Sequence, residues 1–412
     1  MLKIPELNPL PAEVLAVPEP VAFVGGAESY DLPLCAARGE EAELLVELGQ
    51  EVEYGQAVAM LESGESVSAP VSGQLAEIVM VKLPAVGKIP CARILPNKLT
   101  EEAPIWPNES QTVKPVTYKA DEILSAAKRA GITEERSRQR LATVLTTSPK
   151  GAWVCAAAYD DQPFTAANRL LFRRYMPQII EGLQLCAVAA GGARIALALP
   201  EDYPLPENFP NDITVFPLPT NRYPGYGAIK KQLSGRSLCL LGVQALLALY
   251  RAALSGTPQT GVIVTVWGDT MESPKQLYAH YGTPVYQVCQ QAGVTGEVDR
   301  VVAGGVMNGS VISINSVIAP GITELTVLNK ATPQHPVSCV GCGRCISACP
   351  ERLMPLYIMQ AYEQNDYLLL KQLNASQCSG CGSCGYICPA HTGIGAFLPQ
   401  IAAKMKMEGN AQ

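Results

Sequence analysis

Two cysteine runs with the same spacing occur in the last quarter of this 412-residue chain. The first reads CVGCGRCISACP (339–350) and the second reads CSGCGSCGYICP (378–389). In each run, two residues lie between the first and second cysteines and two between the second and third. A fourth cysteine follows after three more residues, directly before a proline. Thiolates are soft ligands, and four of them at one site suit zinc or an iron–sulfur cluster. The runs therefore constrain the fold strongly, because this part of the chain must wrap around metal.

The spacing within the runs favours iron–sulfur clusters over zinc. Zinc sites usually combine one Cys-x-x-Cys pair with a second pair some distance away. Three close cysteines and a fourth before proline are typical of bacterial two-cluster ferredoxins, in which the fourth cysteine ligates the other cluster. Two zinc knuckles are the alternative. We predict one [4Fe–4S] cluster on Cys339, Cys342, Cys345 and Cys388, and a second on Cys378, Cys381, Cys384 and Cys349.

Composition and charge narrow the compartment and the partners. The other six cysteines are scattered singly, mostly among apolar neighbours, as expected of small buried side chains. The first residues contain no apolar signal core, so we expect a reduced, cytoplasmic compartment. The longest apolar stretch, at 237–254, is interrupted by Gln244 and Arg251 and predicts a buried helix. A net charge of −6 without a basic stripe gives no reason to expect a nucleic-acid partner.

The remaining three quarters of the chain predict an α/β multidomain fold. Short strands with tight glycine turns follow Leu44, in a pattern that resembles the barrel-sandwich of biotinyl and lipoyl carriers. The tip MLESGESV (60–67) carries no lysine for a covalent group, so a structural barrel is expected. A helix is expected at 118–132. Strand-like and helical runs then alternate from 152 to 260, with helices expected at 164–187 and 238–254, which predicts a largely parallel sheet.

The order of these pieces resembles the C subunit of the Rnf-type ion-translocating ferredoxin:NAD oxidoreductases, which is related to the flavoprotein subunit of respiratory complex I. The resemblance includes the barrel and both cysteine runs. It also rests on PFTAANRLLFRRYMPQIIEGL (163–183), PLPTNRYPGYGAIKKQL (217–233), VTVWGDTMESPKQLYAHYGTPV (264–285) and VVAGGVMNGS (301–310).

The resemblance implies a domain order for the chain. We expect an N-terminal barrel-sandwich domain at 1–97, a linker at 98–118, and a Rossmann-like α/β domain at 119–260 that resembles the FMN/NADH-binding domain. A β-grasp domain of the SLBB type is expected at 261–328. An α-helical dicluster ferredoxin-type domain, with two [4Fe–4S] clusters, is expected at 329–412.

Three departures surround the nucleotide site that the resemblance implies. The family has a glycine-rich phosphate loop after a helix ending in AGI (130–132), but here TEERSRQRLATVLTTSPK (133–150) contains no glycine and favours a helix. A glutamate-containing motif is replaced by AAYDDQP (157–163), and YPGYGAIK (223–230) lacks the family's acidic residue.

The departures argue against FMN and NADH at this site. On a helix, Arg136, Arg138 and Arg140 would point to different faces and could not replace converging backbone amides. We therefore predict neither catalytic residues nor cofactor-binding residues outside the eight cysteines, and FMN stays a doubtful second cofactor.

These observations favour an electron-transfer iron–sulfur subunit of an Rnf-like oxidoreductase complex. It would relay single electrons between a flavoprotein or reductase subunit and an acceptor. Membrane subunits are further candidate partners, which would place the chain peripherally on the cytoplasmic face of a membrane complex. The alternatives are an FMN-dependent NAD(P)H dehydrogenase subunit with a remodelled nucleotide loop, a cobalamin reductase of similar architecture, and an adaptor whose clusters only stiffen the fold.

Overall fold

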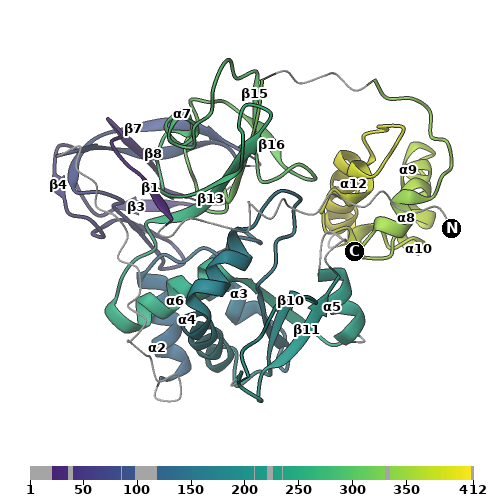
Figure 1. Cartoon of the computed structure of the whole chain (residues 1–412), viewed down its shortest axis with the longest axis horizontal. Coiled ribbons are helices and arrows are strands. Elements are labelled where there is room, and N and C mark those ends of the chain that lie inside the picture. The colour runs from purple at the N-terminus through teal and green to yellow at the C-terminus, as the bar shows by residue number, and fades with distance from the viewer. Residues whose placement is uncertain are drawn as a thin grey trace.

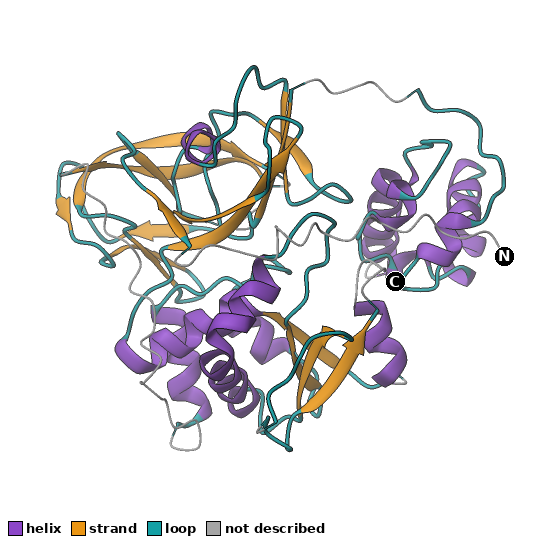
Figure 2. Cartoon of the chain, in the orientation of Figure 1, coloured by secondary structure: helices purple, strands orange, loops and turns teal. Residues whose placement is uncertain are grey.

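A computed structural model describes most of the chain, in four regions that Figures 1 and 2 show in one orientation. The described residues are 21–35, 40–84, 86–97, 118–207, 209–219, 226–233, 235–329 and 335–409. The predicted linker at 98–118 lies outside them except for Tyr118. In Figure 1 the barrel and a mixed sheet lie at the upper left, an α/β layer lies below them, and a helical module lies at the right.

The N-terminal barrel consists of two small antiparallel sheets. One sheet has the strand order β2-β8-β7-β4 and the other has the order β3-β5-β6. The strands are β2 (Tyr30–Pro33), β3 (Ala42–Leu44), β4 (Glu51–Val52), β5 (Ala57–Leu61), β6 (Ser66–Ser68), β7 (Gly73–Leu83) and β8 (Gly87–Pro96). The hairpin tip between β5 and β6 meets the α/β layer, where Lys128 Nζ donates to the Ser63 carbonyl over 2.8 Å.

A mixed sheet of six strands packs against this barrel. Its order is β1-β14-β13-β17-β15-β16. The strands are β1 (Ala22–Val24), β13 (Gly261–Gly268), β14 (Lys275–His280), β15 (Arg300–Ala303), β16 (Ser310–Ile312) and β17 (Glu324–Leu328), with helix α7 (Val285–Gln291) alongside. β1 pairs in parallel with β14, so the N-terminal segment adds a strand to this sheet. Buried residues of the barrel and the sheet form one continuous hydrophobic core.

The α/β layer is a parallel four-stranded sheet in the order β11-β10-β9-β12. Its strands are β9 (Trp153–Ala157), β10 (Ile195–Pro200), β11 (Thr214–Leu218) and β12 (Leu238–Gly242). One face packs on helices α2 (Ala120–Arg129), α3 (Leu141–Thr147), α4 (Ala167–Ala189) and α6 (Val243–Ser255). The other face packs on α5 (Tyr226–Leu233). The predicted parallel layer is confirmed, although residues 238–242 form β12 rather than the start of a helix.

The C-terminal module is helical, as predicted. It contains α8 (Arg344–Ala348), α9 (Pro355–Glu363), α10 (Tyr367–Gln372), η2 (Ala375–Gln377), α11 (Ser383–Tyr386) and α12 (Ile394–Gly409). Its small core combines apolar residues of α9, α10 and α12 with Cys384, and three further cysteines pack against that core. The predicted fold class is confirmed: a barrel-sandwich, mixed and parallel sheets, and a C-terminal cysteine-rich module.

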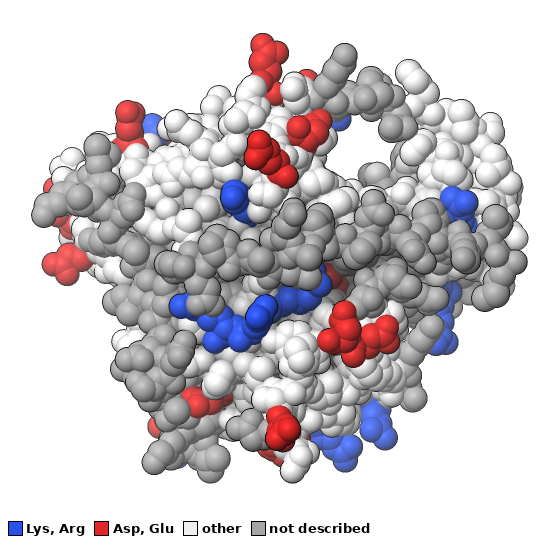
Figure 3. Space-filling view, in the orientation of Figure 1, with Lys and Arg blue, Asp and Glu red and all other residues white. Residues whose placement is uncertain are grey.

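Charge on the surface and apolar length of the helices complete the description of the fold. On the face shown in Figure 3, acidic and basic side chains are interspersed, and some of the basic ones form a short row near the centre. Among the helices that the structure describes, none is both long and apolar enough to cross a bilayer.

Candidate metal centre and adjoining pocket

Four cysteines from both runs line one small cavity in the helical module. Cys378, Cys381 and Cys384 belong to the second run, and Cys349 comes from the end of the first run. Cys349 directly follows α8, at the point where the backbone leaves the helix in an extended conformation. The fourth cysteine of one run thus lies with the first three of the other, which is the exchange that the ferredoxin spacing predicts.

The other four cysteines lie nearer to the surface. Cys339 and Cys342 are exposed, and Cys345 is partly buried beside them. The Val337 N–H donates to the Ala390 carbonyl over 3.0 Å, which holds the start of the first run beside the end of the second. This contact brings the backbone near Cys339 toward the backbone near Cys388.

The loops between the cysteines have the backbone freedom that a cluster requires. Gly341, Gly343, Gly380 and Gly382 all have φ between 66° and 76°, a region that residues with a side chain rarely adopt. The Gly341 N–H also donates to the Cys339 sulfur over 3.4 Å. In the part of the chain that the structure describes, no three His, Cys, Asp or Glu side chains are grouped to hold a single metal ion. The donors and the loops fit cysteine-ligated clusters.

The module docks on the rest of the chain through its second-run side. Lys230 Nζ on α5 lies 2.8 Å from both carboxylate oxygens of Glu351, and the Tyr226 hydroxyl hydrogen-bonds the Ser379 hydroxyl. From the mixed sheet, the Met307 carbonyl lies so close to Gly382 that a Cβ there would approach within 1.8 Å of it. The second run therefore faces inward, and the exposed cysteines of the first run face away.

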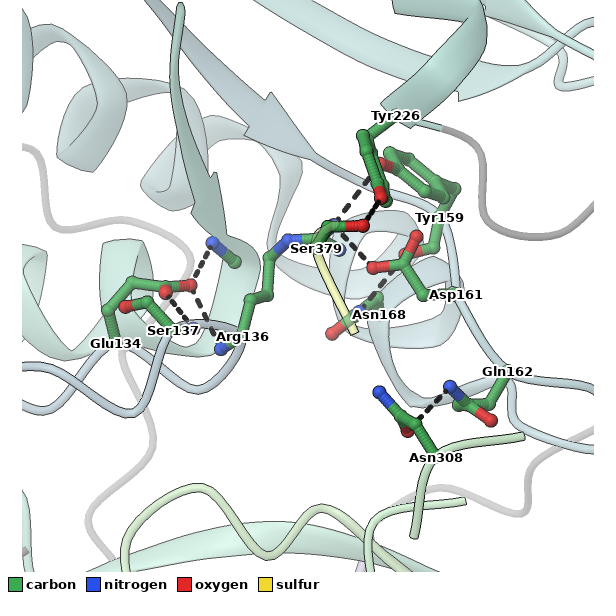
Figure 4. Close-up of polar contacts among 11 residues, drawn as sticks. Glu134, Arg136, Ser137, Tyr159, Asp161, Gln162, Asn168, Tyr226, Asn308 and Ser379 are labelled. Carbon is green, nitrogen blue, oxygen red and sulfur yellow. Dashed lines mark hydrogen bonds and ion pairs between the residues drawn. The ribbon is translucent and has the colours of Figure 1, made fainter. Parts of the chain in front are cut away.

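A polar pocket of about 230 Å³ lies at this junction. Its lining comes from three regions: the α/β layer, the mixed sheet, and Ser379 and Cys381 of the second run. The motif at 301–310 joins these regions, because the Gln162 side chain donates to Asn308 Oδ1 and accepts from the Met307 N–H, each over 3.0 Å. Figure 4 shows this contact and the neighbouring polar groups.

The predicted helix at 133–150 is wrong for its first half. Residues 133–140 form a turn closed by a bridge between Thr133 and Arg140, and only α3 (Leu141–Thr147) is helical. Glu134 holds the turn together, because its carboxylate accepts from the N–H groups of Arg136 (3.2 Å) and Ser137 (2.6 Å). A helix would have pointed this buried side chain away from those donors.

The turn also places two carboxylates at the start of α6. Glu134 accepts from the Gly242 N–H over 2.9 Å, and Glu135 accepts from the N–H groups of Gln244 (2.8 Å) and Ala245 (3.0 Å). A Cβ at position 242 would lie 2.0 Å from a Glu135 oxygen, so only glycine leaves room for this cap. Burial and the neighbouring Glu134 raise the pKa of Glu135 to about 7, against the opposing effect of the helix N–H groups.

The three arginines of the turn have three different roles. Arg136 forms an ion pair with Asp161 and stacks over the Tyr159 ring, 5.2 Å from its centroid. Although burial alone would lower the Arg136 pKa, the charge of Asp161 raises it overall. Arg140 is buried and donates to the Gly131 carbonyl and to Thr133 Oγ1. Arg138 lines the pocket.

This geometry does not fit the phosphate of FMN. In the family, backbone amides after AGI converge on that phosphate. Here the N–H groups of Thr133, Glu134, Arg136, Ser137, Arg138 and Gln139 donate to acceptors within the chain. The first N–H groups of α6 donate to Glu134 and Glu135. A phosphate would have to displace two buried carboxylates.

The sequence-based prediction missed several pocket residues. Glu324 is buried on β17 and accepts from Trp267 Nε1 over 2.9 Å. Burial raises the pKa of Glu324 to about 8, with Trp267 opposing and Asp160 adding to the rise. A lone acid in the apolar strand ITELTVL (322–328) was the available signal. Tyr226, in the segment YPGYGAIK (223–230), hydrogen-bonds Ser379 of the second run, and its sequence neighbours give no sign of this contact.

Comparison with known proteins places the two ends of the chain. A family model described as the RnfC barrel sandwich hybrid domain matches residues 15–98, and one described as a 4Fe-4S dicluster domain matches residues 333–389. The C subunits of the ion-translocating oxidoreductase complexes of Salmonella arizonae and Salmonella typhimurium are each 28% identical over 243 residues, or 51% of this chain. The match spans only 35% and 32% of those relatives, respectively.

Solved structures of an NAD⁺-reducing [NiFe]-hydrogenase overlap with part of the chain. For the air-oxidized form the TM-score is 0.44 at 17% identity, and the alignment includes 69% of this chain and 53% of the hydrogenase chain. For the H₂-reduced form the TM-score is 0.47 at 15% identity, and the alignment includes 71% of this chain and 64% of the hydrogenase chain. An overlap of this extent carries no inference about chemistry. The two family models, however, confirm the predicted resemblance and the two [4Fe–4S] clusters: residues 15–98 are similar to the RnfC barrel sandwich hybrid domain, and residues 333–389 are similar to a 4Fe–4S dicluster domain.

Proposed function

We propose that this chain is an electron-transfer iron–sulfur subunit of an Rnf-like oxidoreductase complex. The observation that supports this proposal best is the cavity lined by Cys349 together with Cys378, Cys381 and Cys384. We assign the second cluster to these four residues and the first cluster to Cys339, Cys342, Cys345 and Cys388. Each [4Fe–4S] cluster exchanges one electron at a time, so two of them in one small module form a relay.

The placement of the module determines which cluster faces the rest of the chain and which lies near the surface. The second set of cysteines faces the α/β layer and the pocket, whereas Cys339 and Cys342 of the first set are exposed. Large apolar side chains are exposed near the first set, including Val340 (67%) and Val337 (58%). In Figure 3 the upper part of this module carries few acidic or basic side chains. Such a surface suits a protein partner, and we assign electron exchange with a partner to the first cluster.

The domain limits at 97, 118, 260 and 328 are part of the proposal. So is membership in a complex with flavoprotein or reductase subunits, on the cytoplasmic face of a membrane when that complex has membrane subunits. The dehydrogenase and cobalamin reductase alternatives require a nucleotide or a corrinoid site. The turn at 133–140 disfavours the first alternative, and no observation among the described residues favours the second.

A redox titration followed by electron paramagnetic resonance tests the relay. Anaerobically purified protein should show two one-electron reductions, and the fully reduced sample should show the broadened signal of two interacting clusters. Substituting Val340→Asn at the exposed end, which adds no charge beside the first cluster, should slow electron exchange with a co-purified partner subunit while both cluster signals remain. A reduced sample with one cluster signal, or with none, would contradict the proposed relay.

A further inference from the structure

The acids that line the junction pocket already have partners within the chain. The Asp160 carboxylate accepts from Arg169 Nε (3.1 Å) and from the Asn168 N–H (3.0 Å). Asp161 pairs with Arg136, and Glu135 caps α6. The carboxyl group of Glu324, with a pKa of about 8, is mostly protonated at pH 7 and carries no countercharge for a neighbouring cation.

Arg138 is the charged group of this lining for which the described part of the chain offers no partner of opposite charge. Among the described residues, its guanidinium has neither an ion-pair partner nor a hydrogen-bond partner. Burial lowers its pKa and no neighbouring carboxylate offsets the effect, in contrast to Arg136. Arg138 is thus a partly buried cation that lacks an anion.

The backbone around Arg138 is shaped to hold it there. Its own φ is +59°, a left-handed conformation that is uncommon for arginine. Its stem lies across Gly321, where a Cβ would approach within 2.5 Å of Arg138 Cγ. Its guanidinium reaches Gly304, where a Cβ would lie 2.9 Å from Nη2. A strained residue and two glycines together keep this side chain in the pocket.

We propose that the junction pocket binds a small anion, with a carboxylate or phosphate head held by Arg138. A guanidinium presents a planar fork that matches either oxyanion. The amide side chains of Gln162, Asn168 and Asn308 border the same space and suit polar substituents. Its volume of about 230 Å³ is below the usual range for drug-sized ligands, so the ligand is smaller than a nucleotide. Cys381 shares the lining, so this ligand lies beside the second cysteine set.

Isothermal titration calorimetry on the full-length chain tests this site without depending on electron transfer. Inorganic phosphate and succinate are titrated separately into anaerobic protein, so that the two kinds of head group are distinguished. At least one probe should bind with a stoichiometry of one. Arg138→Asn should weaken that binding at least about tenfold, because a charge-assisted hydrogen bond is lost while asparagine tolerates the left-handed backbone.

Two further variants make the result decisive. Arg138→Lys keeps the charge but loses the fork, so its affinity should fall between those of the wild type and Arg138→Asn. Arg129→Gln, at an exposed position of α2, removes an arginine outside the lining and should leave affinity unchanged. Circular dichroism and iron content identify variants that are misfolded. Absence of binding by both probes, or wild-type affinity in a folded Arg138→Asn variant, would overturn the proposal.

Discussion

In the dicluster domain, cysteines from two separate runs converge around space that a cluster can fill, whereas in the α/β layer the turn at 133–140 directs its own charges inward. Cys349 and the second run line one cavity. Glu134 and Glu135 instead occupy the N–H groups of the turn and of α6. The dicluster domain leaves room for a cluster. The α/β layer instead places the carboxylates of Glu134 and Glu135 where the family would bind a phosphate.

The comparison contrasts two kinds of cofactor site. A cluster needs thiolates at fixed spacing, and loss of one ligand removes the site. A phosphate site needs only converging N–H groups, and two carboxylates of the chain can accept hydrogen bonds from the same N–H groups when no ligand is bound. The fold then stays intact, because Gly242 and α6 remain capped.

Breaking the cysteine cavity should have the largest effect. Cys349→Ser removes a ligand of the second cluster, so the iron content should fall from about eight to about four per chain. The surviving electron paramagnetic resonance signal should be that of the first cluster. Cys289→Ala, at a buried cysteine on α7, is the matched control and should keep the full iron content. Selective loss of the first cluster would show that the assignment of Cys349 is wrong.

Removing the internal anion should destabilise the α/β layer. Glu135→Ala leaves two buried N–H groups of α6 without their acceptor and should cost about 2–4 kcal/mol of unfolding free energy. Glu135→Gln keeps one acceptor oxygen and should cost less. Urea unfolding followed by tryptophan fluorescence measures both, with Glu207→Ala on the exposed surface as the control. An effect of Glu135→Ala no larger than that of the control would contradict the capping role.

The pH dependence of stability should identify Glu324. Its pKa is raised from 4.5 to about 8, so the folded chain holds a proton that the unfolded chain loses, and stability falls as pH rises through this window. Between pH 6 and pH 8, the free energy of unfolding of Glu324→Gln should fall by about 2 kcal/mol less than that of the wild type. Glu135, with its pKa raised to about 7, should leave a shallower dependence of the same sign. Parallel curves for variant and wild type would argue against a buried neutral Glu324.

The ion pair between the two regions should matter least. Lys230 is half exposed, with its side chain 50% accessible, and such pairs contribute at most about 1 kcal/mol. Lys230→Ala should therefore leave the urea midpoint almost unchanged and the iron content complete. A loss of iron in this variant would mean that docking on α5 shapes the second cluster.

The sequence could predict the two [4Fe–4S] clusters because the cysteine spacing is local and dictates its own chemistry, whereas the assignment of each cysteine to a cluster stays a prediction. The alternation of strands and helices likewise predicted the parallel layer, since each element carries its own periodicity. The turn at 133–140 could not be predicted, because its glutamates and arginines favour a helix when considered alone. Its shape depends on Gly242, about 100 residues later, whose N–H requires the Glu134 carboxylate. The position of Arg138 in the pocket could not be predicted for the same reason, since Gly304 and Gly321 lie far along the chain.

The contrast between the two regions is tested most directly by one acid extraction of freshly, anaerobically purified protein. Iron, sulfide, zinc and flavin are measured in the same extract. We expect about eight iron and eight sulfide per chain, with no stoichiometric flavin, because the cysteine sets are complete and the phosphate donors are occupied. One FMN per chain would contradict the filled site and favour the dehydrogenase alternative. Stoichiometric zinc with little iron would contradict the cluster assignment itself.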